Sequence, residues 1–207
     1  YMDRITDFSS EKPTLTVIAN ECTHSNEDIS MYNIPLNGKI LFSKDNPYVI
    51  DTVTLKQVSN IVSFLKENGV YDNTRIIIAS DHGMGYRAFD KYSTYYVDTY
   101  TKDHFNPLLL VKDFDSSEPL KTDGRFMTNA DVPAIALKDI IDNPVNPFTG
   151  NPINEDYKAE GVKITTADLF MDYHSKSKYY YTVPEDSWYI IKDDIFIDSN
   201  WTKLNGE

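Results

Sequence analysis

The residues best suited to chemistry are an aspartate and a histidine that directly follow an apolar run. Asp81 and His82 come after Ile76-Ile77-Ile78-Ala79-Ser80 and before Gly83. A carboxylate oxygen and an imidazole nitrogen together suit Zn, Mn, or a mixed pair of hard and borderline ions. Gly83 lets the backbone turn sharply and approach a bound group closely. Spacing alone leaves two interpretations open, a metal site or an ordinary turn at the end of a strand.

Two further histidines are candidates for the same site. His24 lies just past a predicted strand, which places it at the same sheet edge as Asp81. His104 precedes Phe105-Asn106-Pro107 and could reach the same rim. For each, the alternative is a surface loop histidine. His174 lies in a polar stretch, where we expect a structural or exposed role.

Hydrophobic patterning predicts the elements that position these residues. Apolar, β-branched runs predict strands at 14–20 and 74–80, the second buried on both faces. Between them, apolar residues at three- and four-residue spacing predict a helix from about Val49, ended by Gly69. A helix between two such strands is typical of a βαβ unit with a parallel sheet. Ligands of α/β folds bind at the carboxyl ends of such strands.

The remaining sequence predicts additional elements and a division into two parts. We expect a strand at 107–112, a helix at 130–141 capped by Thr128 or Asn129, a loop at 143–152, and a hairpin within 178–197. The fold class is therefore α/β. Residues 1–150 are predicted to form the main domain part, and residues 151–207 a β-rich C-terminal extension packed on it.

Composition excludes some functions. The 207 residues carry a formal net charge of -12, which argues against nucleic acid as a partner because phosphate contacts need a basic face. An apolar content of 41% supports a core. No apolar run approaches the roughly 20 residues of a membrane span, so we expect membrane association only through an upstream anchor. The single cysteine, Cys22, rules out an internal disulfide.

The stretch Asp72 to Gly85 resembles the metal-binding region of sulfatase-like proteins in the alkaline phosphatase superfamily. Three further segments resemble that family in their order along the chain and in the kinds of residue that they contain: 14–24, 105–112 and 128–141. The resemblance implies an alkaline phosphatase-like mixed sheet flanked by helices. It also implies that Asp81 and His82 bind a divalent metal (Mn, Zn, Ca or Mg), and that His24 contacts the sulfuryl or phosphoryl group.

The chain departs from the family pattern in what it lacks. The family's first acidic ligand and its nucleophile cannot be located, and the chain begins at Tyr1. We therefore expect the N-terminal half to be missing and this part alone to be inactive. Cys22 is not followed by the Cys-x-Pro-x-Arg pattern that formylglycine formation requires, so it is expected to be a buried small residue.

The resemblance implies part of a metal-dependent enzyme that acts on sulfate or phosphate esters. Sulfatase-like hydrolases and phosphoglycerol or phosphoethanolamine transferases both fit, the latter outside the cytoplasmic membrane of a bacterium. One alternative is a non-catalytic binding module on the same fold. Another is an unrelated α/β domain with a chance Asp-His-Gly, which would have no metal affinity.

Overall fold

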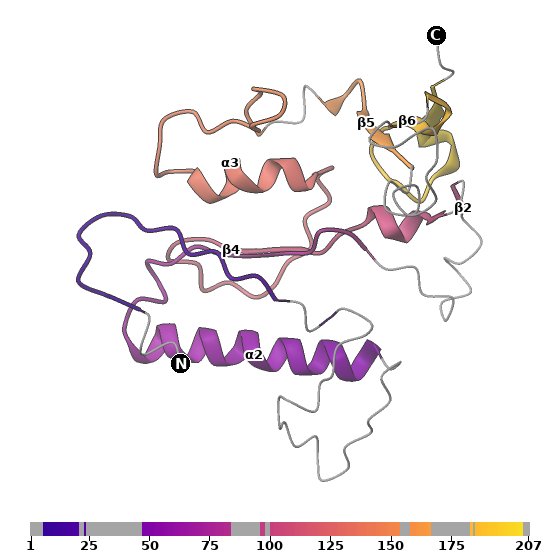
Figure 1. Ribbon diagram of the computed structural model, residues 1–207. Coiled ribbons are helices and arrows are strands. Elements are labelled where there is room, and N and C mark those ends of the chain that lie inside the picture. The colour runs from indigo at the N-terminus through magenta and orange to yellow at the C-terminus, as the bar shows by residue number, and fades with distance from the viewer. Residues whose placement is uncertain are drawn as a thin grey trace. The chain divides into compact units, whose positions relative to one another are not determined.

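The computed structural model describes residues 6–20, 23, 47–83, 96–97, 100–153, 158–166, 183 and 185–204. The chain forms two compact units, residues 1–74 and 75–207, and each is described by itself (Figure 1). The boundary that the sequence predicts near residue 150 stays a prediction. Within the described residues, no helix combines the length and the apolar character needed to cross a bilayer.

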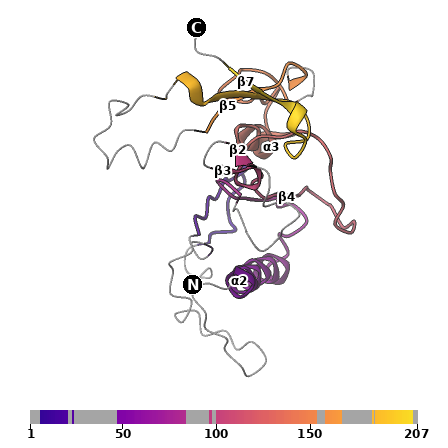
Figure 2. The same ribbon diagram turned by 90° about the vertical axis from the view of Figure 1, so that its right-hand side faces the viewer.

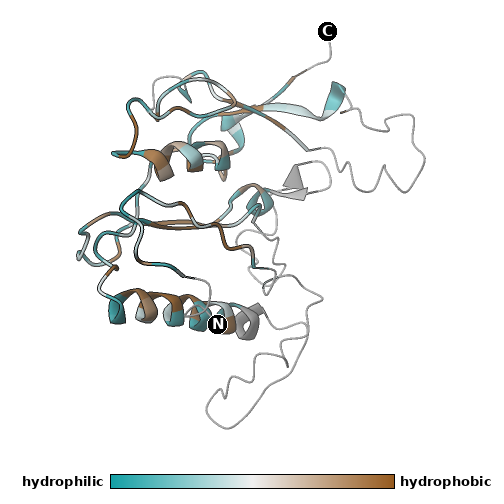
Figure 3. Ribbon diagram, turned by 60° about the vertical axis from the view of Figure 1, so that its left-hand side comes forward, coloured by the Kyte–Doolittle hydropathy of each residue, from teal (hydrophilic) through white to brown (hydrophobic). Residues whose placement is uncertain are grey.

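The main element of the first unit is helix α2, Pro47–Glu67. It begins at a proline, whose fixed φ suits the first turn of a helix. Val53 is buried and the apolar residues at 58, 61, 62 and 65 are half-buried, as the periodicity predicts, whereas Leu55 is exposed. Hydrophilic and hydrophobic bands alternate along α2 in Figure 3.

Gly69 ends α2 through a Schellman motif. Its φ of 67° lies in the left-handed region that favours glycine. The Val70 N–H donates to the Leu65 carbonyl at 3.0 Å, and the Gly69 N–H donates to the Lys66 carbonyl at 3.1 Å. These two bonds satisfy carbonyls that the last helical turn leaves unpaired. The predicted helix and its terminating glycine are both confirmed.

The strand predicted at 14–20 is wrong. Residues 13–20 have no regular secondary structure, and their side chains are exposed, with Leu15 at 74% and Val17 at 82%. A strand needs a neighbour to pair its backbone groups, and no strand pairs with this segment in the part of the chain that the structure describes. The preceding segment contacts α2 through Phe8, whose ring lies 5.7 Å from the Phe64 ring.

In the second unit, β1 (Ile76–Ala79) pairs with β4 (Leu109–Lys112). Both strands were predicted, but the pairing is antiparallel, with Ile76 opposite Lys112 and Ala79 opposite Leu109. The expected parallel βαβ unit is not seen among the described residues, because its first strand, predicted at 14–20, is absent there. Burial on both faces is also wrong, since the three isoleucines are half-buried and Ala79 is exposed. A two-stranded ribbon is too narrow to bury both of its faces.

The helix predicted at 130–141 is present but shorter. A 3-10 turn, η3 (Asn129–Asp131), leads into α3, Val132–Leu137. Thr128 is the N-cap, and its N–H donates to the Asp131 carboxylate at 2.8 Å. The helix ends early because Lys138 leaves the right-handed helical region with a ψ of 135°, and Asp139 follows with a φ of 62°.

A three-stranded antiparallel sheet lies near the C-terminus (Figure 2). Its order is β5-β6-β7, with β5 Val162–Thr165, β6 Trp188–Ile191 and β7 Trp201–Lys203. Among the described residues of the segment predicted as a hairpin, β6 is the one strand, and Ile195 and Ile197 lie in a turn and a bend. Tyr179 and Tyr181 lie outside the described residues. The short elements are β2 Tyr96–Val97, β3 Tyr100–Thr101, η2 Lys102–Phe105, η5 Glu185–Ser187 and η6 Asp198–Asn200.

These helices and small antiparallel sheets are consistent with an α/β fold. The alkaline phosphatase-like sheet arrangement stays a prediction.

Arg75 links the start of β1 to the end of β4 and to the end of α3. Its side chain is only 4% exposed. Nε and Nη2 donate to one carboxylate oxygen of Asp113, at 2.9 and 2.7 Å. Nη1 donates to the last carbonyls of α3 and its following turn, those of Ile135, Ala136 and Lys138. A guanidinium thus serves as the C-terminal cap of the helix, where positive charge is favourable.

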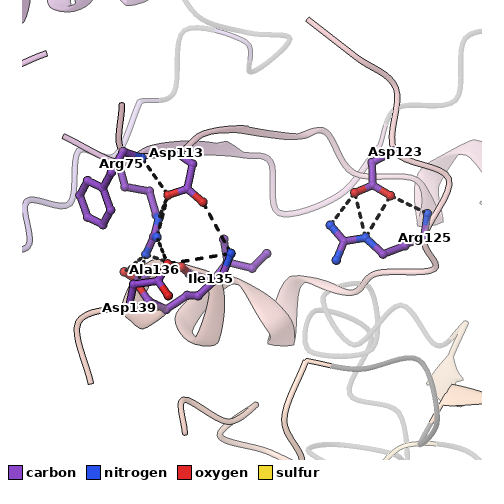
Figure 4. Close-up of polar contacts among 9 residues, drawn as sticks. Arg75, Asp113, Asp123, Arg125, Ile135, Ala136 and Asp139 are labelled. Carbon is purple, nitrogen blue, oxygen red and sulfur yellow. Dashed lines mark hydrogen bonds and ion pairs between the residues drawn. The ribbon is translucent and has the colours of Figure 1, made fainter. Parts of the chain in front are cut away.

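Figure 4 shows this Arg75 cluster together with a second arginine–aspartate pair, Asp123 and Arg125. The second pair is local and its side chains are more than half exposed. Both are arginine–aspartate ion pairs, but they differ in burial. The exposed pair therefore serves as a control for the effect of burial on stability.

Replacing Arg75 by alanine is expected to lower the free energy of unfolding by about 3 kcal/mol, because carbonyls and a carboxylate lose their donors. This value is at the low end for a broken buried pair because Asp113 is 41% exposed. Arg125→Ala, the control, should cost at most about 1 kcal/mol. Urea denaturation followed by circular dichroism measures both values. Equal losses would contradict the assignment of Arg75 as the main link.

Asp113 should make stability depend on pH. Partial burial alone would raise the pKa of Asp113, but hydrogen bonds from Arg75 and the Phe114 N–H, with the charges of Arg75 and Lys138, lower it overall. A lowered folded-state pKa gives stabilisation that is complete above the unfolded pKa of about 3.9 and is lost as pH falls through the folded value. Asp113→Asn should therefore show a shallower loss of unfolding free energy below about pH 4 than the wild type. Parallel acid profiles would refute this.

Candidate metal centre

The candidate site is the 80–83 segment, which follows the last residue of β1. The Ser80 N–H donates to the Leu108 carbonyl at 3.0 Å, which continues the β1–β4 ladder by one residue. The Leu108 N–H then donates to the Ser80 hydroxyl oxygen at 2.7 Å instead of to a backbone carbonyl. The β1–β4 hydrogen-bond ladder therefore ends at Ser80, and Asp81 and His82 lie beyond the paired strands.

Asp81 and His82 present their side chains to solvent, at 89% and 64% exposed. Asp81 Oδ1 accepts the His82 N–H at 2.9 Å, while Asp81 Oδ2 lies 3.7 Å from His82 Nε2. His82 Nδ1 lies 2.6 Å from the Gly83 carbonyl oxygen. Because a carbonyl only accepts hydrogen bonds, this contact assigns the proton of a neutral His82 ring to Nδ1, and that tautomer leaves the Nε2 lone pair available to a ligand.

The separation of these two donor atoms is compatible with a shared divalent metal ion. Two donor atoms on one tetrahedral ion with bonds of about 2.0–2.1 Å lie roughly 3.4 Å apart. The 3.7 Å between Asp81 Oδ2 and His82 Nε2 is close to that separation. The Nδ1 contact to a backbone carbonyl is the usual support for a metal-ligating histidine. Within the described ranges, however, no group of three or more His, Cys, Asp or Glu is placed to complete a site.

The 3-10 turn η2 supports this segment on one side. The Gly83 N–H donates to the His104 carbonyl at 2.8 Å. A Cβ at position 83 would lie 1.9 Å from the Asp103 carbonyl oxygen, so only glycine fits here. The same approach brings the His104 ring to 6.2 Å from the His82 ring, in a stacked orientation.

The C-terminal sheet fixes η2 in turn. Lys102 is buried, forms an ion pair with Asp198 and lies 5.4 Å from the centre of the Trp201 ring. Phe105 meets Trp201 edge-on at 5.5 Å. The Trp201 indole donates to the Ile195 carbonyl at 2.6 Å. Sequence reasoning missed the contacts of η2 with Asp198 and Trp201, because they join segments almost a hundred residues apart.

The other side of the 80–83 segment is supported by η3. The Asn129 side-chain nitrogen donates to the Ser80 carbonyl at 2.9 Å and to the Asp81 carbonyl at 2.8 Å. The sequence had suggested Asn129 only as an alternative helix cap, a role that Thr128 takes.

A buried polar cluster holds η3. Asp131 is fully buried and forms an ion pair at 2.7 Å with the buried Lys158. The Asn146 amide donates to the other Asp131 oxygen at 3.1 Å. Lys158 also donates to the Phe126 carbonyl at 2.7 Å. Breaking such a pair leaves an uncompensated buried charge, so the cluster fixes η3 strongly.

The structure thus brings three of the candidate residues together: Asp81, His82 and His104. The other candidate, His24, lies outside the described residues, as do Cys22 and His174, so the predictions for these three residues are not tested.

Comparison with known proteins gives one finding. No curated protein and no solved structure matches the chain. The model of the family described as type I phosphodiesterase / nucleotide pyrophosphatase matches residues 56–194, about two thirds of the chain. The match includes Asp81, His82, His104 and Asn129. The chain therefore belongs to the type I phosphodiesterase / nucleotide pyrophosphatase family, a member of the alkaline phosphatase superfamily that its Asp81-His82-Gly83 motif had indicated.

Proposed function

We propose that this chain is part of a metal-dependent phosphoester hydrolase in which Asp81 and His82 bind the metal ion. The observation that supports this most is the 3.7 Å separation of Asp81 Oδ2 and His82 Nε2, with His82 Nδ1 occupied by the Gly83 carbonyl. Members of the family generally use divalent metals such as zinc, which agrees with this donor set.

In this proposal a bound divalent ion supplies positive charge that stabilises the phosphoryl oxygens and activates a nucleophile. Asp81 contributes a negative oxygen ligand, and His82 contributes a neutral nitrogen whose orientation is fixed through Nδ1–H. We assign His104, whose ring lies 6.2 Å from the His82 ring, to the substrate side of the pair. We assign His24 to the substrate as well. The nucleophile and the remaining ligands come from the N-terminal half that we expect upstream.

The class of substrate is part of the same proposal. Phosphate esters are the first choice because the family consists of phosphodiesterases and pyrophosphatases. Sulfate-ester hydrolysis and phosphoglycerol or phosphoethanolamine transfer are the other candidates that the sequence raised. Nucleic acid is disfavoured by the net charge of -12. We further propose an extracytoplasmic, bacterial location with membrane association only through an upstream anchor.

The proposal predicts that Asp81→Ala weakens Zn or Mn binding by at least about tenfold, because half of the donor pair is lost. Isothermal titration calorimetry on the intact protein measures the dissociation constants. The control is Asp142→Ala, which removes an exposed aspartate from the turn after α3 and should leave binding unchanged.

The same experiment separates the alternatives. If Asp81→Ala binds metal as tightly as the wild type, the metal-centre assignment fails and a non-catalytic binding module becomes the better account. Loss of binding in Asp81→Ala alone supports the proposal. A panel of phosphodiester, phosphomonoester and sulfate-ester substrates, assayed with the metal-loaded wild type, then decides the substrate class.

A further inference from the structure

We infer that Asn129 is a positioning residue whose side chain fixes the backbone on both sides of Asp81 and thereby aims the metal-ligand pair. This inference rests on the proposed function, since it concerns how the same pair is oriented. Asn129 lies in η3, far from Asp81 in sequence. The two hydrogen bonds that would position the pair both go from its side chain to backbone carbonyl oxygens.

The two bonds act on adjacent peptide planes. The Ser80 carbonyl belongs to the peptide that precedes the Asp81 Cα, and the Asp81 carbonyl belongs to the peptide that follows it. One amide nitrogen carries two hydrogens, so Asn129 can donate one to each carbonyl. Fixing both planes sets φ and ψ of Asp81, and with them the direction of its Cα–Cβ bond.

The next peptide is fixed from the opposite side. The Gly83 N–H, in the peptide that follows His82, donates to the His104 carbonyl at 2.8 Å. His82 is therefore also flanked by two held peptides, one bonded to Asn129 and one bonded to η2. Asn129 of η3 holds two of the three successive peptide planes around the ligand pair, and η2 holds the third.

Exposure explains why such backbone support is needed. The Asp81 and His82 side chains are 89% and 64% exposed, so packing does little to orient them. A ligand pair on a loose segment loses orientation entropy whenever it binds an ion, which weakens binding. Asn129 offsets this because η3 is itself held by the buried Asp131–Lys158 pair.

The test compares Asn129→Asp with Asn68→Asp in the intact protein. Asn129→Asp keeps the shape of the side chain but places oxygens against two carbonyl oxygens. It should preserve the helix, since an acidic residue is favourable in a first helical turn. Asn68 donates its side-chain nitrogen to the Phe64 carbonyl at 2.8 Å, so Asn68→Asp breaks the same kind of bond away from the candidate site.

Two readouts are used, zinc affinity by calorimetry and amide hydrogen exchange of residues 80–83 without metal. We expect Asn129→Asp to bind zinc about tenfold more weakly and to exchange faster at 80–83, with a melting temperature near that of the wild type. Asn68→Asp should match the wild type in both. A merely structural role would lower the melting temperature without selectively changing these two readouts.

The outcomes also separate this inference from the proposed function. If Asp81→Ala loses zinc binding but Asn129→Asp keeps both wild-type affinity and wild-type exchange, the positioning role is overturned and the metal centre stands. If the wild type binds no zinc, the proposed function fails, and the exchange comparison alone decides whether Asn129 fixes the segment. Asn129→Ala, which removes the donor without adding repulsion, should show the same changes in smaller degree.

Discussion

The Arg75 guanidinium joins the start of β1, the end of β4 and the last carbonyls of α3. The guanidinium supplies donors to carbonyls at the helix end, where the helical ladder stops, and a positive charge to Asp113, whose carboxylate also accepts the Phe114 N–H. A single planar cation satisfies both because its donors form a fixed fork. The short helix α3 therefore has a defined position beside β1 in the second unit.

The other end of α3 is tied to the same strand. Arg75 precedes β1 and Asn129 bonds to the carbonyls that follow it, so the helix and the strand are joined at both ends. The segment between these ties is short and extended, which leaves little freedom for the residues that follow. The result is a well-tied backbone segment that carries two exposed side chains at its end. A metal site on such a support loses little conformational entropy when it binds an ion.

Local patterns predicted the parts of this arrangement that local forces determine. The periodicity of α2, the left-handed Gly69 and the apolar runs of β1 and β4 each depend on residues close in sequence. The Asp81-His82-Gly83 motif likewise combines strand, ligands and turn within a few residues. Strand pairing could not be read in this way: the run at 14–20 has strand-like residues but no pairing partner among the described residues, and β5 was missed.

Long-range polar contacts explain the rest of what sequence reasoning missed. Nothing local marks Lys158 as the counter-charge of Asp131, or Trp201 as the support of η2, because neither contact follows a periodic pattern. Asn129 was noticed only for its position near a helix start. Its actual bonds depend on where β1 ends, which only the three-dimensional arrangement determines.

The ion pair of Asp131 with Lys158 has a consequence for the order in which the protein is made on the ribosome. Asp131 is synthesised 27 residues before Lys158, and Lys102 almost a hundred residues before Asp198. A nascent chain that ends before these partners holds an aspartate and a lysine that cannot be buried without an opposing charge. The two supports of the 80–83 segment are therefore completed only after Lys158 and Asp198 have been synthesised. The motif that is most recognisable in the sequence therefore takes its final form only after segments far downstream of it have been made.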